Sequence, residues 1–432
     1  MHRTIQVLTF TCLLLCLNPT GSALADRVEV RENAEGWMLL VNGEPLMVKG
    51  MNWDFFPIGT NYEYLLWEES DEFIQNALDY EMELLQAIGV NAIRVYSDIP
   101  ARWIEYIHEE YGIFTMINHS FGRYGLELDG EWVSNTDYSD PRVIELLLGE
   151  VAALAREYRG TRGLLLYLLG NENNYGLFWS GAETEDIPIE NRESEERARQ
   201  MYRLFNKAAI AMKEIDPDRP VAMANGDLQF LDIIVQEVPD MDILGANVYR
   251  GVSFTYLFDR VKEKYGKPVL LTEFGADAFN AKTKEEDQKC QAYYIHGNWR
   301  EIYGYAAGMG GAGNSIGGFT FQFSDGWWKY GQTFDLDVHN TEATWANDAY
   351  ECDYVEGENN MNEEWFGVMA KGPVDSDGHY KLYPRAAYHV LKQVHSIDPY
   401  APGITLGMIE KLFENISLAE AYRHAQEDKR DR

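Results

Sequence analysis

Two glutamates in this sequence each stand at the end of a strongly apolar run. Glu172 follows six consecutive apolar residues, 164–169, and Glu273 closes the run Pro-Val-Leu-Leu-Thr at 268–272. A lone carboxylate in such a position costs several kcal/mol to bury, so each must be paired or functional. When two carboxyls face each other, one can act as a general acid and base while the other acts as a nucleophile. The structural alternative is that both pair with arginines in the core.

A division of labour between two carboxyls suits the cleavage of glycosidic bonds. When one carboxylate attacks the anomeric carbon and the other protonates the leaving oxygen, the two carboxyls lie about 5–5.5 Å apart and configuration is retained. A separation beyond about 6.5 Å leaves room for a water and gives inversion. The elements that carry Glu172 and Glu273 must therefore end at one common edge.

The chain alternates short β-rich apolar runs with amphipathic stretches of helical length. The runs predicted as strands are 46–52, 91–97, 113–118, 164–171, 220–225, 242–249, 268–274 and 318–323. The stretches predicted as helices are 71–88, 101–111, 141–158, 195–215, 228–238, 254–265, 285–306 and 384–394. Eight βα units predict a (β/α)8 barrel with both glutamates at its C-terminal face. A doubly wound sheet is disfavoured because residues 49–53, Lys-Gly-Met-Asn-Trp, lack a glycine-rich dinucleotide turn.

Segments outside the βα units complete the predicted organisation. Residues 1–25 form a signal peptide, and residues 26–400 form the barrel. Within the barrel, residues 26–48 form a β-hairpin turning at Asn42-Gly43 that closes the bottom, and 324–383 are an insertion after strand eight. Residues 401–432 form a helical tail, amphipathic around 408–422 and charged at its end.

The first residues have the layout of a cleaved export signal. Arg3 precedes an apolar run over 5–17, and a small-residue site, Ala-Leu-Ala, ends at Ala25. The run is too short for a comfortable membrane span, and a lipid anchor at Cys16 is disfavoured by the bulky Leu15 before it. The protein is expected to be secreted or periplasmic, without a membrane span.

Charge and cysteine content narrow the class of partner. The formal net charge of −33 disfavours nucleic acid and anionic polymers, although a salty or extracellular habitat would explain it equally. After the signal peptide only Cys290 and Cys352 remain, so one bridge is available and no zinc-site spacing exists. The acidic stretches at 335–340 and 351–364 could hold calcium, but their spacing does not match an EF-hand loop and a solvated acidic insertion is favoured. No metal or cofactor is expected, and the oligomeric state is left open.

The long loops expected at the C-terminal face are rich in aromatic residues. Aromatic rings stack on the apolar faces of sugars, so these loops suit a cleft for an oligo- or polysaccharide. The tryptophans selected as sugar contacts are Trp53, Trp179, Trp327 and Trp328. The structural alternative is that more than half of these rings only pack the loops against the barrel.

Several motifs in order resemble glycoside hydrolase clan A, and the family 2 barrel most closely. They are Val41-Asn42-Gly43 with Lys49-Gly50-Met51-Asn52, Gly89-Val90-Asn91-Ala92-Ile93-Arg94, Asn171-Glu172, Asn247-Val248-Tyr249 and Thr272-Glu273-Phe274-Gly275. The resemblance implies that Glu172 is the general acid/base and Glu273 the nucleophile. It also implies that Arg94 keeps Glu273 ionised, Asn171 holds the sugar 2-hydroxyl, and Tyr249 orients Glu273. A structural ion pair for Arg94 and a core role for Tyr249 are the alternatives.

Departures from the family pattern leave the sugar open. Where the family tends to have a histidine after the strand-two arginine, this chain reads Arg94-Val95-Tyr96, and the typical strand-eight tryptophan is Phe321. The run 93–97 and Gly170-Asn171-Glu172 also resemble family 72, the β-1,3-glucanosyltransferases.

Three functions are therefore weighed. The first is a retaining β-glycoside hydrolase acting on a neutral β-linked glycan, the second is a β-glucanosyltransferase acting on β-1,3-glucan, and the third is a catalytically silent glycan-binding barrel.

Overall fold

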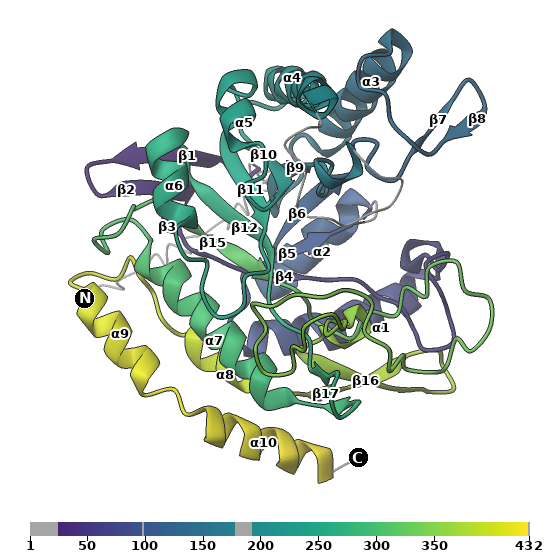
Figure 1. Ribbon diagram of the computed structural model, residues 1–432, viewed down its shortest axis with the longest axis vertical. Helices are drawn as coiled ribbons and strands as arrows, with labels where there is room; N and C mark the ends of the chain where they lie inside the picture. The colour runs from purple at the N-terminus through teal and green to yellow at the C-terminus, as the bar shows by residue number, and fades with distance from the viewer. Residues whose placement is uncertain (1–24, 97–98, 178–191, 431–432) are drawn as a thin grey trace, which may run out of the picture.

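A computed structural model describes residues 25–96, 99–177 and 192–430 of the chain. Its centre is a closed barrel of parallel strands in the order β10-β11-β12-β15-β4-β5-β6-β9 (Figure 1). The barrel strands are β4 (Val48–Asn52), β5 (Ala92–Val95), β6 (Phe114–His119), β9 (Leu164–Leu169), β10 (Val221–Gly226), β11 (Ile243–Asn247), β12 (Val269–Phe274) and β15 (Ser315–Thr320). The predicted barrel is confirmed, and closure excludes the doubly wound sheet.

Helices surround the barrel close to the predicted ranges. They are α1 (Asp71–Ala87), α2 (Ala101–Tyr111), α3 (Pro141–Tyr158), α4 (Arg192–Ile215), α5 (Leu231–Glu237), α6 (Leu257–Lys264), α7 (Gln288–Gly304) and α8 (Ala386–Val394). Local signals set the ends: Asp140 accepts a hydrogen bond from the Arg142 N–H with Pro141 as the first helical residue, and Gly112 ends α2 in the left-handed region.

The prediction that a helix starts at residue 285 was wrong. Glu285 and Glu286 form β14, which pairs with β13 (Phe279–Asn280). Asp287 then starts α7 by accepting a hydrogen bond from the Cys290 N–H. The charged pair that looked like a helix start is a short strand leading up to that cap.

The N-terminal segment is a three-stranded antiparallel sheet rather than a two-stranded hairpin. Its strands are β1 (Val28–Asn33), β2 (Gly36–Val41) and β3 (Glu44–Leu46). The expected turn is present, with Asn42 and Gly43 both at positive φ between β2 and β3. Hydrogen bonds from the Val28 and Trp37 N–H groups reach residues just before β10 and β15, so the sheet lies across the N-terminal end of the barrel.

Two layers of apolar side chains fill the fold. Inside the barrel, Leu39 of β2 packs with strand residues such as Leu166, Leu270 and Phe319. A larger cluster lies between the strands and the helices. Because each central strand is buried on both faces, its sequence is almost continuously apolar.

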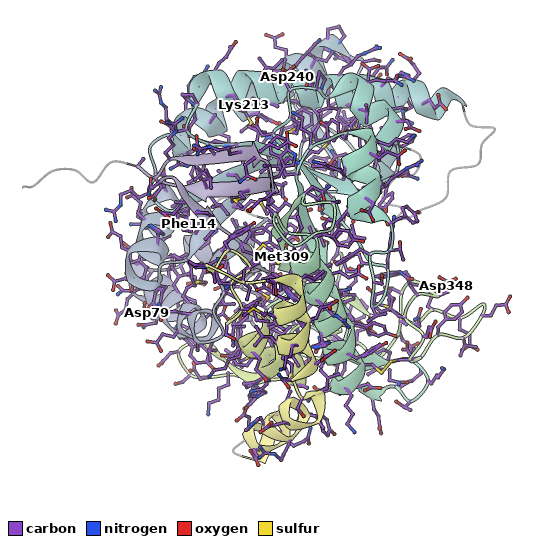
Figure 2. The ribbon with its side chains drawn as sticks, turned by 90° about the vertical axis from the view of Figure 1, so that its left-hand side faces the viewer. Asp79, Phe114, Lys213, Asp240, Met309 and Asp348 are labelled. Atoms are coloured by element: carbon purple, nitrogen blue, oxygen red, sulfur yellow. A yellow bond between two sulfur atoms is a disulfide. The ribbon has the colours of Figure 1, made fainter. Side chains whose placement is uncertain are left out.

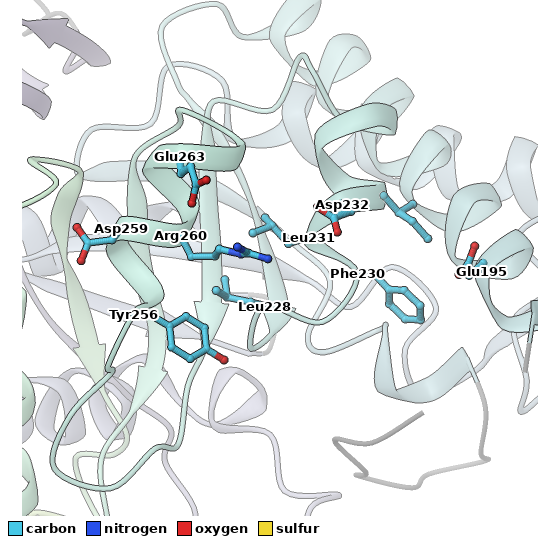
Figure 3. A pocket seen from close by; sticks show the side chains of 10 residues that line it. Glu195, Leu228, Phe230, Leu231, Asp232, Tyr256, Asp259, Arg260 and Glu263 are labelled. Carbon is cyan, nitrogen blue, oxygen red and sulfur yellow. The ribbon is translucent and has the colours of Figure 1, made fainter. Parts of the chain in front are cut away.

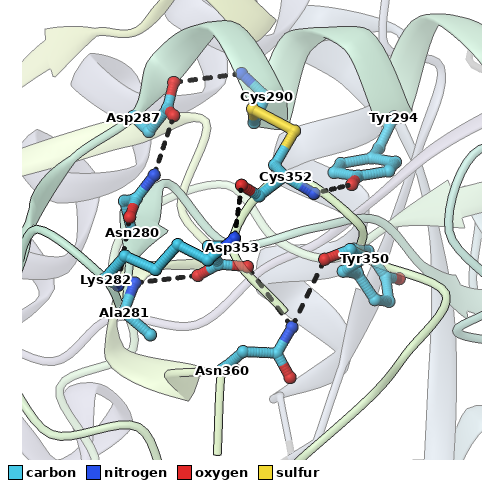
Figure 4. The surroundings of a disulfide bond; sticks show 10 residues. All are labelled: Asn280, Ala281, Lys282, Asp287, Cys290, Tyr294, Tyr350, Cys352, Asp353 and Asn360. Atoms are coloured by element: carbon cyan, nitrogen blue, oxygen red, sulfur yellow. Dashed lines mark hydrogen bonds between the residues drawn. A yellow bond between two sulfur atoms is a disulfide. The ribbon is translucent and has the colours of Figure 1, made fainter. Parts of the chain in front are cut away.

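The insertion after β15 covers one side of the C-terminal face. It contains η3 (Glu363–Trp365), β16 (Met369–Val374) and β17 (Tyr380–Pro384). A disulfide joins Cys352 of the insertion to Cys290 of α7 (Figure 4). Shorter elements lie in other loops: η1 (Leu66–Glu68), η2 (Tyr175–Leu177), and the hairpin β7 (Leu126–Leu128) with β8 (Glu131–Val133).

The C-terminal tail is two helices rather than one amphipathic stretch. They are α9 (Leu406–Glu414) and α10 (Leu418–Arg430), which lie along α7 and α8 (Figure 1). Ser417 starts the second helix by accepting a hydrogen bond from the Glu420 N–H. Ile409 and Phe413 of α9 and Ala421 and Ala425 of α10 are buried in the main core.

Charged side chains occupy the outer surface, where they link neighbouring elements (Figure 2). Lys213 of α4, for example, bonds to Asp242 and to the carbonyl of Asp240. None of the helices in the described part of the chain is both long and apolar enough to cross a membrane. Residues 1–24 of the predicted signal peptide lie outside the described residues.

Candidate active site

Glu273 ends β12 with its carboxylate held by three donors. Arg94 donates to Oε1 at 2.9 Å, and the Tyr96 hydroxyl donates to the same oxygen at 2.6 Å. The Tyr249 hydroxyl donates to Oε2 at 3.0 Å. Only 7% of Glu273 is exposed. Three donors to a nearly buried carboxylate satisfy its two oxygens and fix its orientation.

The two tyrosines act as donors to this carboxylate. Burial and the neighbouring Glu273 carboxylate hold the pKa of the Tyr96 hydroxyl well above its usual range, and the same two causes act on the pKa of Tyr249. Both hydroxyls therefore keep their protons near neutral pH and point them at Glu273. Tyr96 in turn contacts the side-chain oxygen of Asn52 at 2.8 Å, which fixes it against β4.

Arg94 lies on β5 and is fully buried. Besides Glu273, its guanidinium donates to the side-chain oxygens of Asn118 on β6, at 2.6 Å, and of Asn171, at 2.9 Å. It also reaches the Thr272 carbonyl at 3.1 Å. A buried guanidinium with this many acceptors is fully satisfied, so it can stay in the barrel as a fixed positive charge.

Asn171 is oriented from both sides of its carboxamide. Its oxygen accepts from Arg94 and, at 3.0 Å, from Asn247 of β11. Its Nδ2 donates to the Tyr124 hydroxyl at 2.8 Å. These contacts define which end of the carboxamide is the oxygen and which is the nitrogen. Nδ2 is directed toward Tyr124, which is 60% exposed. A side chain held in this way can present a constant polar group to a ligand.

Glu172 follows Asn171 in a strained backbone conformation. Its φ is +57°, in the left-handed region that few residues other than glycine adopt. Its N–H donates to the Ala224 carbonyl of β10 at 2.9 Å, which fixes the turn, and the residue is only half-buried. Local strain that the surroundings maintain at a cleft favours a functional interpretation.

The structure brings most of the predicted polar residues into one network. Arg94, Asn171, Tyr249 and Glu273 are connected by hydrogen bonds, and Glu172 is bonded to Asn171 through the chain. The predicted contact between Arg94 and Glu273 is confirmed. The roles of these residues in catalysis stay predictions.

Sequence reasoning missed four members of this network. They are Tyr96, Asn118, Tyr124 and Asn247, which together orient Glu273, Arg94 and Asn171. Tyr96 was noted only as a departure from a family histidine. A signal was present for three of them: Tyr96 directly follows β5, Asn118 lies near the end of β6, and Asn247 ends β11.

Removing the Tyr96 hydroxyl should weaken catalysis without disturbing the fold. A hydrogen bond to a charged group contributes about 1.5–3 kcal/mol, so Tyr96→Phe should lower kcat/KM by about 10- to 150-fold. The control is Tyr106→Phe, which removes a hydroxyl bonded to Asp79 on the outer helices. An unchanged kcat/KM for Tyr96→Phe would contradict this role.

Two of the four predicted tryptophan contacts need correction. Trp53 is 3% exposed, and its indole N–H donates to the buried Glu81 of α1 at 2.6 Å. Trp327 is 2% exposed, and its N–H donates to the Leu336 carbonyl at 2.7 Å. Both rings satisfy their polar atom inside the protein and pack the loops, so their placement does not fit a sugar platform.

Trp328 fits the prediction better. It is half-buried, donates to Asp54 at 2.7 Å and has its ring 5.9 Å from Phe321, which lies 6.3 Å from Tyr249. Burial raises the pKa of the Asp54 carboxyl. Trp179, the fourth predicted contact, lies outside the described residues.

One cavity in the described structure lies away from this network. It has a volume of about 720 Å³ and is lined from α4, α5, α6 and nearby loops (Figure 3). Its described lining includes none of the predicted site residues. Among the described residues, no group of three or more His, Cys, Asp or Glu side chains is placed to hold a metal ion.

Comparison with known proteins gives one family. The model of the TIM barrel domain of glycosyl hydrolases family 2 matches residues 28–299. Similarity to family 72 finds no support in these matches. A search of the curated proteins finds no match.

Solved structures share the fold at low sequence identity. A β-galacturonidase from Eisenbergiella tayi is 16% identical over 87% of this chain and 55% of its own, with a TM-score of 0.51. A β-glucuronidase from Bacteroides uniformis is 16% identical over 85% of this chain and 37% of its own, with a TM-score of 0.54. A β-glucuronidase from Bifidobacterium dentium is 19% identical over 87% of this chain and 50% of its own, with a TM-score of 0.51. The chain thus spans about half or less of the length of these proteins.

Proposed function

Since this chain belongs to glycosyl hydrolases family 2 through its TIM barrel domain, we propose that it is a retaining β-glycosidase acting on a neutral β-linked glycan. The observation that carries the proposal is the set of hydrogen bonds that the Glu273 carboxylate accepts. This carboxylate receives hydrogen bonds from Arg94, Tyr96 and Tyr249, which hold it in a fixed orientation. An oriented, charged carboxylate at the end of a barrel strand is what a nucleophile requires.

In the first step, a Glu273 oxygen attacks the anomeric carbon while the bond to the leaving oxygen breaks. Glu172 donates its proton to that oxygen, and a covalent glycosyl-enzyme forms. Asn171 lies between the two glutamates in the network and is held by Arg94 and Asn247. Its fixed carboxamide suits a contact to the sugar 2-hydroxyl that strengthens in the transition state.

In the second step, Glu172 removes a proton from water, which attacks the anomeric carbon and releases Glu273. Two displacements return the sugar in its original β configuration. If a sugar hydroxyl replaces water, the same residues transfer the glycosyl unit, which is the glucanosyltransferase alternative. The intact network around Glu273 and Arg94 favours an enzyme over a catalytically silent barrel, because such buried polar groups are costly to keep.

One observation favours a second substrate class. Arg123, in the loop after β6, is half-buried, and its Nε is buried without a hydrogen-bond partner in the described part of the chain. Its guanidinium lies 5.5 Å from the ring of Tyr124, which contacts Asn171. A cation beside the site, with no carboxylate partner among the described residues, would suit a uronate, the sugar class named for the similar solved structures.

A panel of aryl glycosides tests the proposal. We expect turnover of at least one neutral β-glycoside among glucoside, galactoside, mannoside and xyloside, with the β-anomer as the first product by proton NMR. Preference for β-glucuronide or β-galacturonide, lost in Arg123→Ala but kept in the exposed control Arg142→Ala, would favour the second class. No turnover of any β-glycoside, or an α-anomer as first product, would contradict the proposal.

We further propose export, on the basis of the signal-like residues 1–25. The disulfide between Cys290 and Cys352 supports it, because such bonds persist mainly in oxidising compartments.

A further inference from the structure

A second, smaller cavity lies within the insertion after β15. Its volume is about 180 Å³, below the roughly 300–1,000 Å³ of sites for drug-sized ligands, so it suits a single monosaccharide unit. Its walls include Trp328, Tyr330, Gln332, Asn340, Thr344 and Glu364. An aromatic wall combined with amide and hydroxyl groups is the chemistry that recognises a sugar ring.

The cavity is adjacent to the carboxylate network and distinct from it. Trp328 forms part of its wall and lies next to Phe321, which lies next to Tyr249. Tyr249 donates to Glu273. Trp328, Phe321 and Tyr249 thus form a continuous row of rings between the cavity and the proposed nucleophile.

One buried amide lies next to a residue of the cavity wall. Gln322 is 1% exposed, and its Nε2 has no hydrogen-bond partner in the described structure. A methyl group added at Gly326, which lines the cavity, would lie 2.8 Å from that nitrogen, so the cavity wall packs closely against this amide.

The charges in the wall are largely neutralised within it. Lys329 pairs with Glu364 at 2.8 Å, and the same glutamate accepts from the Asn340 N–H. The one cation among the described residues of the wall is therefore paired, which suits a neutral sugar.

Exposed rings continue the aromatic surface outward. Tyr330 is 83% exposed and lies 4.9 Å from Tyr62, which is 43% exposed and belongs to the loop after β4. Asn61 donates to the Gln332 carbonyl at 2.9 Å, so the two loops are joined. Such a pair can support the face of a further ring.

We propose that this cavity, with the Tyr330 and Tyr62 rings, is a subsite for a distal unit of a neutral β-linked oligosaccharide. The chemical class of the oligosaccharide rests on the proposed function, whereas the binding of an oligosaccharide in this cavity does not. The protein should accordingly prefer oligosaccharides over aryl monosaccharides.

The test compares Tyr330→Ala and Gln332→Ala with Phe334→Ala. Phe334 is 71% exposed on the same loop and does not line the cavity in the described structure, so it is a matched control. The probes are β-linked pentasaccharides of glucose, mannose and xylose, followed by calorimetric titration and by kcat/KM. Loss of a ring contact and a hydrogen bond should weaken binding of the preferred pentasaccharide by on the order of 10-fold in both test variants, and by less than about 2-fold in the control.

Activity on the best aryl monosaccharide should be unchanged in all three variants. If aryl glycosides are cleaved but no pentasaccharide binds, or if all three variants bind it like the parent protein, the subsite is overturned while the proposed function stands. If no glycoside is cleaved but a pentasaccharide binds and Tyr330→Ala weakens it selectively, the proposed function fails and the subsite stands.

Discussion

Glu273→Ala should abolish turnover of every substrate, lowering kcat by at least about 10⁴-fold, because both chemical steps pass through this carboxylate. The loss should not depend on the leaving group, since even an activated aryl glycoside needs the nucleophile. Azide is small enough to enter the vacated space beside Arg94 and Tyr249. It should attack an activated substrate from that face and give a glycosyl azide of inverted configuration, which proton NMR would identify.

The control for this variant is Glu157→Ala, which changes an exposed glutamate on α3. It should keep the parent activity. Comparable circular dichroism and melting of Glu273→Ala would show that the loss is chemical, because removing a carboxylate also leaves Arg94 partly unpaired and costs stability. Residual activity above about 1% of the parent on a natural glycan would contradict the assigned role.

Glu172→Ala should behave differently with good and poor leaving groups. General acid–base catalysis contributes about 10²–10⁴-fold, so the activity of the variant on a natural glycan with a poor leaving group should fall by at least about 10²-fold. An activated aryl glycoside needs no proton, so it should still form the glycosyl-enzyme, and the next step should become limiting. Azide, which needs no general base, should then intercept the intermediate with net retention.

Identical responses of the two variants to azide would contradict this division of roles. Glu172→Gln provides the matched isosteric control, because it keeps the shape of the side chain in its left-handed turn while removing the proton donor. It should show the same leaving-group dependence as Glu172→Ala.

The barrel could be predicted from the sequence because its strands are buried on both faces. The run 164–169 is apolar throughout, and every residue of β9 is buried. Such runs, spaced by amphipathic helices, leave few alternatives to a closed parallel sheet. Boundaries were less certain where local capping decides them, as at Asp287 before α7 and at Ser417 between the tail helices.

The polar centre of the site could be predicted in part, for a different reason. Glu172, Glu273 and Arg94 stand at strand ends, and a charge there must find a partner, as Arg94 and Glu273 do. Tyr96 was missed because a tyrosine after a strand fits a core position equally well in the sequence.

The tryptophans show the limit of prediction from sequence. Whether an indole faces a cleft or the core depends on a partner distant in the chain, such as Glu81 for Trp53. The pattern of apolar residues contains no information about that partner. Half-buried Trp328 and buried Trp327 are adjacent in sequence, yet their N–H groups bond to different loops.

Mass spectrometry of Glu172→Ala after mixing with the best activated aryl glycoside tests most directly whether Glu273 becomes bound to the sugar. Without its general base the variant should accumulate the glycosyl-enzyme, so the intact protein should gain the mass of one glycosyl unit. After proteolysis, that added mass should lie on the peptide containing Glu273, and azide should remove it. An adduct on another carboxylate, or turnover with an inverted product and no adduct, would contradict Glu273 as the nucleophile.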